Sequence, residues 1–142
     1  VICGREEAAM TTTLNPYIGF QDTAQQAMEF YRDIFGGELT MNTFGEFGME
    51  GPGADKIMHA HLNTPGGMTL MASDTPPGGK PRSGSAITIS LSGDDAAELR
   101  GYWEKLSYGG TIEVPLEKQM WGDEFGQLVD RFGVGWMVNI GS

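Results

Sequence analysis

The sequence has very little cysteine and few basic residues. Its single cysteine, Cys3, has no partner for an internal disulfide, and zinc sites built from several cysteines are excluded. Nine Lys and Arg stand against nineteen Asp and Glu, which gives a formal charge of −10. Because nucleic acids and anionic membrane surfaces attract positive charge, neither is expected as a partner.

Long apolar runs are also missing. No stretch approaches the ~20 apolar residues that a helix needs to cross a bilayer. Hydrophobic residues still make up 39% of the 142 residues, and aromatic residues 10%, so the chain can build a core and differs from disordered acidic chains. The composition therefore predicts a soluble, cytoplasmic, single-domain protein.

The first residues differ in character from the rest. They show neither an apolar run nor a periodic pattern, and Met10 followed by three threonines is typical of a natural start. We expect residues 1–12 to be a disordered leader or tag. The expected single domain covers 13–140, with module one at 13–74, a Pro/Gly-rich linker at 75–84 and module two at 85–140.

What the sequence does contain is a repeated helical pattern. The first copy places apolar residues at spacings i, i+3, i+4 and i+7, and the second copy repeats it 72 residues later. These residues are Ala27, Phe30, Tyr31 and Ile34, then Leu99, Tyr102, Trp103 and Leu106. A glycine pair follows each copy. Asp22 or Thr23 precedes the first and Asp94 or Asp95 the second, as candidate N-caps.

Strand-like runs surround each helical pattern in the same order. One run precedes the helix and three follow it: residues 14–20, 38–44, 56–63 and 68–73 in the first half, and 86–91, 111–116, 127–130 and 136–140 in the second. Each half is thus a βαβββ unit. A single unit would leave one sheet face uncovered, so the pattern predicts an α+β fold of paired βαβββ modules, forming a curved mixed sheet around a central cleft with helices outside.

Several segments resemble the glyoxalase/bleomycin-resistance/extradiol-dioxygenase (vicinal oxygen chelate) superfamily. They are Asn15–Phe20, Ala27–Gly37, Met58–Leu62, Trp121–Gly126 and Asp130–Trp136. They are most similar to the PhnB-like branch, whose members often carry the label 3-demethylubiquinone-9 3-methyltransferase-like. The resemblance implies paired βαβββ modules and a homodimer. Methyl transfer itself lacks support, because no Gly-rich βαβ start is present to hold S-adenosylmethionine.

The resemblance also bears on metal binding. Metal-dependent members hold an ion between the modules through His, Glu or Gln at four points. In this chain those points carry Pro16, Thr88, Met137 and either Leu70 or Met71. None of these offers the imidazole or carboxylate that hard divalent ions prefer. We therefore expect no metal and no cofactor at the family position.

His59 and His61 are the only histidines, and they stand two apart in an expected strand. Strand periodicity places both on one face, toward the cleft. Three interpretations stay open. The pair could contact ligand or act as a general base. It could share a metal with a carboxylate, the candidates being Glu46, Glu50, Asp74 and Asp123. It could also be an ordinary polar part of a half-solvated strand.

Two aromatic residues, Trp121 and Phe125, fall in a Gly-flanked segment that we expect to be a loop at the cleft mouth, where they could stack on a planar ligand. Trp103 and Trp136 are assigned to the core. The expected ligand-binding residues are His59, His61, Met71, Thr88, Ser90, Trp121, Phe125 and Met137.

The favoured hypothesis is a metal-free protein that holds an apolar or aromatic small molecule in the inter-module cleft, for sequestration or for cofactor-free proton transfer. One alternative is a metal-dependent lyase, isomerase or oxygenase with a relocated site on His59 and His61. Another is a structural dimer without ligand. Whether the chain is an enzyme stays open at this point.

Overall fold

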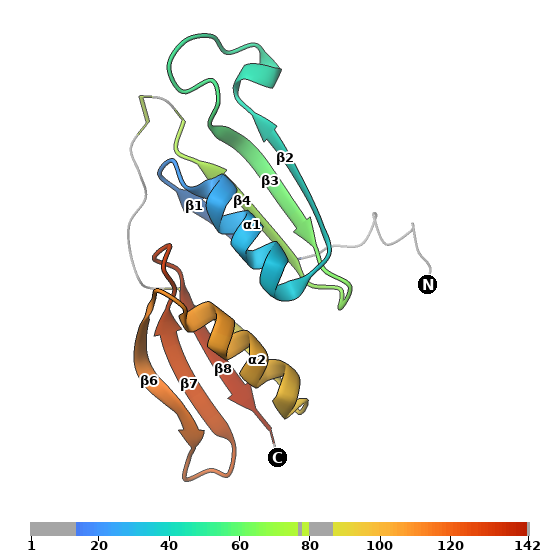
Figure 1. Ribbon diagram of the computed structural model, residues 1–142, viewed down its shortest axis with the longest axis vertical. Coiled ribbons are helices and arrows are strands. Elements are labelled where there is room, and N and C mark those ends of the chain that lie inside the picture. Colours follow the sequence, from blue (N-terminus) through green and yellow to red (C-terminus); the bar gives the residue numbers. More distant parts are fainter. Residues whose placement is uncertain (1–13, 77, 80–86, 142) are drawn as a thin grey trace.

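The computed structural model describes residues 14–76, 78–79 and 87–141. The expected leader, residues 1–12, and most of the expected linker, residues 75–84, lie outside the described residues. Module one contains β1 (Tyr17–Phe20), α1 (Ala24–Phe35), β2 (Glu38–Thr43), the short helix η2 (Gly45–Phe47), β3 (Ile57–Asn63) and β4 (Thr69–Asp74). Module two contains β5 (Ile89–Gly93), α2 (Ala96–Ser107), β6 (Thr111–Lys118), β7 (Glu124–Val129) and β8 (Gly135–Ile140). The two modules repeat the predicted order of one strand, one helix and three strands (Figure 1).

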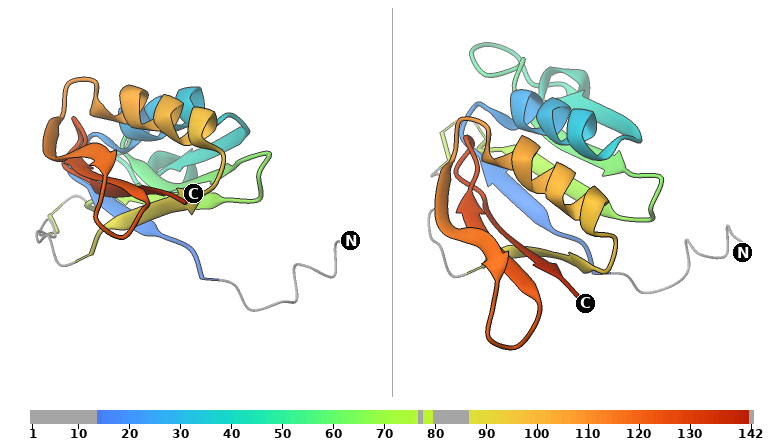
Figure 2. Two further views of the ribbon diagram at one scale, coloured as in Figure 1. Left: turned by 90° about the horizontal axis from the view of Figure 1, so that it is seen from below. Right: turned by 60° about the horizontal axis from the view of Figure 1, so that its bottom comes forward.

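The strands form two four-stranded mixed sheets, in the orders β1-β4-β3-β2 and β5-β8-β7-β6. In each sheet the first strand of the module runs parallel to the last, and the other neighbours are antiparallel. The predicted α+β fold of paired modules is confirmed. The two sheets do not close into a barrel, and both helices lie on the same side of the molecule (Figure 2).

Each sheet has a covered face, against its helix, and an open face on the other side. Alternation along the strands separates them. The covered face holds buried apolar residues: Phe20, Ala60, Leu62, Leu70 and Ala72 in sheet one, and Leu91, Leu128, Trp136, Val138 and Ile140 in sheet two. The intervening residues belong to the open faces; His59, His61 and Met137 among them are half-buried, and others, such as Tyr17 and Ser90, are exposed.

Aromatic rings join the two modules on the covered side. Phe35 at the end of α1 lies 4.8 Å from Tyr102 of α2 and 5.7 Å from Trp136 of β8, between ring centroids. Tyr31 lies 5.6 Å from Trp136. Trp103 and Trp136 are both buried, as predicted. The modules therefore share one core rather than packing as separate units.

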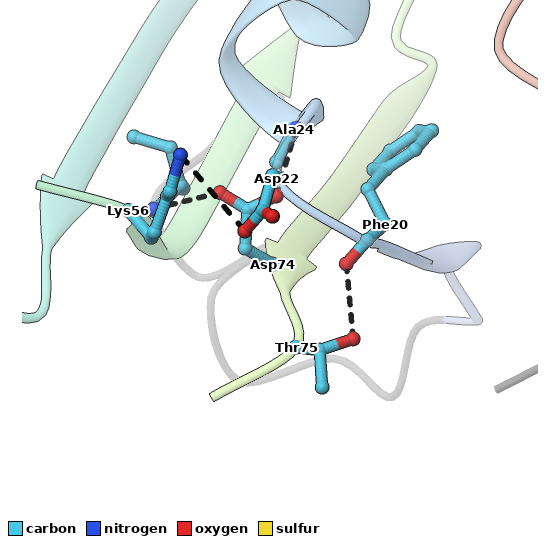
Figure 3. Close-up of polar contacts among 7 residues, drawn as sticks. Phe20, Asp22, Ala24, Lys56, Asp74 and Thr75 are labelled. Atoms are coloured by element: carbon cyan, nitrogen blue, oxygen red, sulfur yellow. Dashed lines mark hydrogen bonds and ion pairs between the residues drawn. The ribbon is translucent and has the colours of Figure 1, made fainter. Parts of the chain in front are cut away.

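The two helices begin in different ways. Thr23, one of the two predicted candidates, is the N-cap residue of α1, but its side chain makes no capping hydrogen bond. The buried carboxylate of Asp74 takes that role: Oδ1 accepts from the Ala24 N–H at 2.9 Å and Oδ2 from the Ile57 N–H at 2.9 Å (Figure 3). Asp22 has a left-handed backbone (φ 68°), and its carboxylate lies 3.9 Å from the Lys56 amine.

A second buried carboxylate, Asp130, lies in the turn between β7 and β8. Its Oδ2 accepts from the Tyr31 hydroxyl at 2.6 Å and from Trp136 Nε1 at 2.9 Å. Its Oδ1 accepts from the backbone N–H groups of Phe132 and Val134 at 2.8 and 3.1 Å. Because Tyr31 belongs to module one, Asp130 links the two modules. Burial and the neighbouring Asp130 charge both raise the pKa of Tyr31, so its hydroxyl stays a donor.

Candidate functional site

A hollow of about 250 Å³ lies where the two modules meet. Module one contributes Pro16, Phe35 and Leu70 to its wall, and module two contributes Ile89, Leu91 and Trp136. Most of these are covered-face side chains of the two sheets. The lining is therefore mainly apolar and is supplied by both halves of the repeat.

Polar groups in this wall are largely engaged with the protein. The Thr64 hydroxyl donates to the Met68 carbonyl at 3.1 Å and accepts from the Met68 N–H at 3.0 Å. The indole N–H of Trp136 donates to Asp130. A molecule in the hollow would thus meet few free hydrogen-bonding groups, which suits an apolar ligand.

The open face of sheet one carries the two histidines. Tyr17, Met71, His61 and Thr40 form one row across the strands, because Tyr17 pairs with Met71, Met71 with His61, and His61 with Thr40. The Tyr17 hydroxyl lies 3.1 Å from His59 Nδ1. The His59 and His61 ring centroids are 6.2 Å apart, with the rings steeply inclined. The predicted placement of both histidines on one face agrees with these contacts.

His61 also belongs to a second polar group on this face. Its Nε2 lies 3.1 Å from Oδ1 of Asn63, and the Thr69 hydroxyl donates to the same oxygen at 3.3 Å. Asn63 and Thr69 are opposite each other on β3 and β4. The imidazole is thus held by two neighbours that are themselves fixed by the strand register.

The open face of sheet two is built differently. Met137 pairs with Ser90 on one side and Gln127 on the other, and Phe125 pairs with Asn139. The Asn139 amide donates to Asp123 Oδ2 at 3.1 Å. In the row across sheet two that contains Met137, Gln127 occupies the place that His61 has beside Met71 in sheet one.

The predicted aromatic loop is only partly correct. Trp121 lies in the hairpin between β6 and β7 and is 63% exposed, whereas Phe125 and Gly126 belong to β7. The rings of Trp121 and Phe125 are 6.2 Å apart, edge to face. This strand position needs a glycine, because a Cβ at residue 126 would lie 2.6 Å from the Trp103 ring. The glycine makes room for a buried indole rather than for a flexible loop.

The predicted ligand-binding residues do not lie together. His59, His61 and Met71 share the open face of sheet one; Phe125 and Met137 share that of sheet two, with Trp121 beside them. Ser90 alone of this set lines the hollow. Thr88 lies just before β5 and close to Gly135 at the start of β8: a Cβ added to Gly135 would lie 3.4 Å from the Thr88 hydroxyl. A cleft between the modules was predicted, but most of its wall was not: apart from Ser90, the lining residues were not predicted to bind ligand, since Leu70 and Ile89 have the pattern of ordinary core residues.

The donor set does not suit the metal of the metal-dependent relatives. Pro16 offers no side-chain donor, Met71 and Met137 offer only thioethers, and Thr88 a neutral hydroxyl. Across residues 14–76, 78–79 and 87–141, no three His, Cys, Asp or Glu side chains are grouped so that they could hold an ion. A hard divalent ion at the family position would therefore lack ligands.

Comparison with known proteins identifies the family. The model of the Glyoxalase/Bleomycin resistance protein/Dioxygenase superfamily matches residues 13–138. The chain belongs to this superfamily. Protein YjdN of Escherichia coli K12 is 31% identical over 141 residues, covering 89% of this chain and 94% of YjdN. Protein Rv0887c of Mycobacterium tuberculosis is 34% identical, covering 88% of this chain and 72% of that protein.

Solved structures of other proteins share the fold. Protein PA1353 from Pseudomonas aeruginosa has a TM-score of 0.84 at 36% identity, covering 92% of this chain and 98% of that one. A putative 3-demethylubiquinone-9 3-methyltransferase, PhnB protein, from Bacillus cereus has a TM-score of 0.75 at 22% identity, covering 91% of this chain and 99% of that one. The PhnB-like resemblance agrees with this likeness. In the part of the chain that the structure describes, neither helix could cross a membrane.

Proposed function

We propose that this chain binds a small apolar or aromatic molecule in the hollow between its modules, without a metal at the family position. The observation that carries the proposal is the apolar wall that both modules build around about 250 Å³ of space. This volume equals roughly eight water molecules, so it fits a compact one- or two-ring molecule. Burial of the ligand's apolar surface would supply the binding free energy.

Indole is a suitable probe for this site. Methyl NMR spectra of the protein, titrated with indole, should show the largest shifts at Leu70, Ile89 and Leu91, which lie in the wall. Shifts confined to the open faces would contradict the proposed place, and an absence of saturable shifts would contradict the proposed function.

Two matched variants sharpen this test. Ile89→Phe adds a ring inside the hollow and should weaken indole binding at least tenfold. Ile87→Phe makes the same change two residues earlier, where the side chain is 87% exposed, and should leave binding unchanged. Equal effects of the two variants would show that the hollow is not the site.

A metal held by His59 and His61 has less support in the geometry. Among the residues that the structure describes, no third His, Cys, Asp or Glu is grouped with the pair so that the three could hold an ion. Two of the proposed carboxylate partners, Asp74 and Asp123, are also hydrogen-bonded elsewhere. Metal analysis of protein purified without chelator should find less than one tightly bound divalent ion per chain. If one ion per chain were found, and were lost in the double variant His59→Ala/His61→Ala, a metal-dependent enzyme would be supported instead.

We further propose that the protein is a cytoplasmic homodimer. Every residue of β6 except Leu116 is exposed, although β6 carries Ile112 and Val114, and such edges are commonly covered by a partner. Light scattering after gel filtration should give twice the 15.3 kDa chain mass. A monomer at micromolar concentration would contradict the dimer without affecting the hollow.

A further inference from the structure

We propose that Met68 is a modification site at the rim of the hollow, where a peroxide oxidises its thioether to a sulfoxide and thereby weakens ligand binding. The proposal rests on the proposed function, because the hollow must hold an apolar molecule for the oxidation to matter. It adds a redox control to that site.

Met68 lies in the turn between β3 and β4, where it faces both the hollow and the solvent. It lines the hollow, and the residue is 37% exposed. Peroxide dissolved in water can therefore reach a side chain that is also part of the wall a ligand contacts.

The other methionines do not combine these two properties. Among the residues that the structure describes, Met28 is fully buried, whereas Met120 is fully exposed in the hairpin between β6 and β7, and neither lines the hollow. The remaining described methionines are half-buried and do not line it: Met41, Met49, Met58, Met71 and Met137. Met68 is thus the described methionine at which oxidation changes the wall itself.

Thr64 holds the backbone of Met68 through three hydrogen bonds. The Thr64 hydroxyl accepts from the Met68 N–H at 3.0 Å and donates to the Met68 carbonyl at 3.1 Å. The Thr64 N–H donates to the same carbonyl at 3.0 Å, and Thr64 is itself buried. The turn therefore keeps residue 68 beside the hollow whatever the oxidation state of its sulfur.

The proposed modification is a two-electron oxygen transfer. A lone pair of the Met68 sulfur attacks one oxygen of hydrogen peroxide, and the S–O bond forms as the O–O bond breaks. The departing hydroxide takes up the peroxide's remaining proton and leaves as water. Sulfur is oxidised and the peroxide is reduced; because sulfoxide reductases reverse this change, it can act as a switch.

The sulfoxide alters what the wall offers to a ligand. A thioether makes favourable contacts with aromatic rings, whereas a sulfoxide is polar and its oxygen needs a hydrogen-bond donor. Two hydroxyls of the wall are already engaged as donors, since Thr64 donates to the Met68 carbonyl and Thr69 to Asn63 Oδ1. A ligand in the hollow would displace water from the sulfoxide, so we expect indole to bind about tenfold more weakly after oxidation.

Peroxide treatment of the intact protein, followed by peptide mass spectrometry, tests the site first. We expect Met68 and Met120 to be oxidised well before the buried Met28. A Met68 that reacts no faster than Met28 would overturn the proposal.

Indole titrations before and after peroxide treatment, with the peroxide removed, then test the effect on the hollow. The affinity of the wild type should fall about tenfold, and repair by sulfoxide reductase should restore it. Met68→Leu keeps an apolar side chain and should bind indole equally before and after treatment, whereas the control Met120→Leu should lose affinity as the wild type does.

The outcomes separate this proposal from the proposed function. An unchanged affinity once Met68 is fully oxidised, or an equal loss in Met68→Leu, would overturn the switch and leave indole binding in the hollow intact. Absence of indole binding by the untreated wild type would contradict the proposed function, and the switch with it.

Discussion

The two modules share a topology but use their buried carboxylates for different purposes. Asp74 ties the start of α1 and of β3 to the end of β4, all within module one. Asp130 instead receives the Tyr31 hydroxyl across the module boundary, together with the Trp136 indole. Because Trp136 lines the hollow, the carboxylate of module two also positions part of the proposed site. The carboxylate of module one thus holds strands and helix of its own module together, whereas the carboxylate of module two holds the two modules against each other.

The open faces diverge in the same way. The last strand of each module keeps a methionine at the matching position, Met71 and Met137, next to the first strand. The strand beyond it holds His61 in module one but Gln127 in module two. The two modules therefore keep the methionine of this row and differ in its polar member, an imidazole in module one and an amide in module two.

Asp130→Ala should produce the largest loss of stability. Tyr31, Trp136 and two backbone N–H groups would lose their common acceptor in a buried place, at a cost of about 4 kcal/mol. Urea unfolding measures it. Asp130→Asn keeps one acceptor oxygen and should cost about half as much. A loss under about 1 kcal/mol for the alanine variant would remove the proposed link between modules.

Asp74→Ala should cost less, about 2 kcal/mol, because two N–H groups rather than four donors lose their acceptor. Thr75→Ala is the matched control beside it: its hydroxyl donates to the Phe20 carbonyl at 3.2 Å, but its backbone N–H keeps the same acceptor. Equal costs for the two variants in urea unfolding would show that Asp74 does not organise module one.

Tyr31→Phe should lower stability by about 1 kcal/mol near neutral pH, because Asp130 loses one donor. The pKa of Tyr31 is raised in the folded state, so the wild type holds this proton more tightly than the unfolded chain does. Its contribution is complete below the usual tyrosine value of about 10 and declines as the pH rises above it.

The variant should therefore lose less stability than the wild type above about pH 10. The pKa of Tyr102 is also raised, first by burial and then by Glu98. The stability of both proteins should therefore still fall somewhat as the pH rises in this range. Unfolding midpoints measured from neutral to strongly alkaline pH test this. Parallel curves for variant and wild type would mean that Tyr31 titrates normally.

The smallest predicted loss of stability comes from the N-cap of α1, which is compared with the N-cap of α2. Asp95 accepts from the Glu98 N–H at 3.1 Å and caps α2 with its own side chain, so Asp95→Ala should cost about 1 kcal/mol. Thr23 stands at the same place in α1 without a capping hydrogen bond, and Thr23→Ala should change stability by only a few tenths of a kcal/mol. A reversed order in thermal unfolding would contradict the assigned caps.

Local patterns predicted the architecture well. All eight strands and both helices lie where alternation and helical spacing placed them, with shifts of a few residues at the ends. β1 and β5 begin three residues later than predicted, and β7 begins three residues earlier, at Glu124 instead of Gln127. The glycine in Phe125-Gly126 resembles a loop residue in isolation, and only the Trp103 ring above it explains why glycine occupies a strand there.

Long-range contacts explain what sequence reasoning could not reach. Asp130 lies 99 residues from Tyr31, and no local pattern relates them. Leu70 and Ile89 have the signature of core residues, and the hollow exists only because the two modules meet beside them. Asn63 and Thr69 acquire their place beside His61 through strand register, which alternation alone does not determine.

A crystal structure of protein purified without chelator and soaked with indole tests the central claim most directly. The account predicts ring-shaped density against Leu70, Ile89 and Trp136, with no cation coordinated by side chains between the modules. A hollow left empty at saturating indole, or an ion bound there by protein ligands, would contradict it.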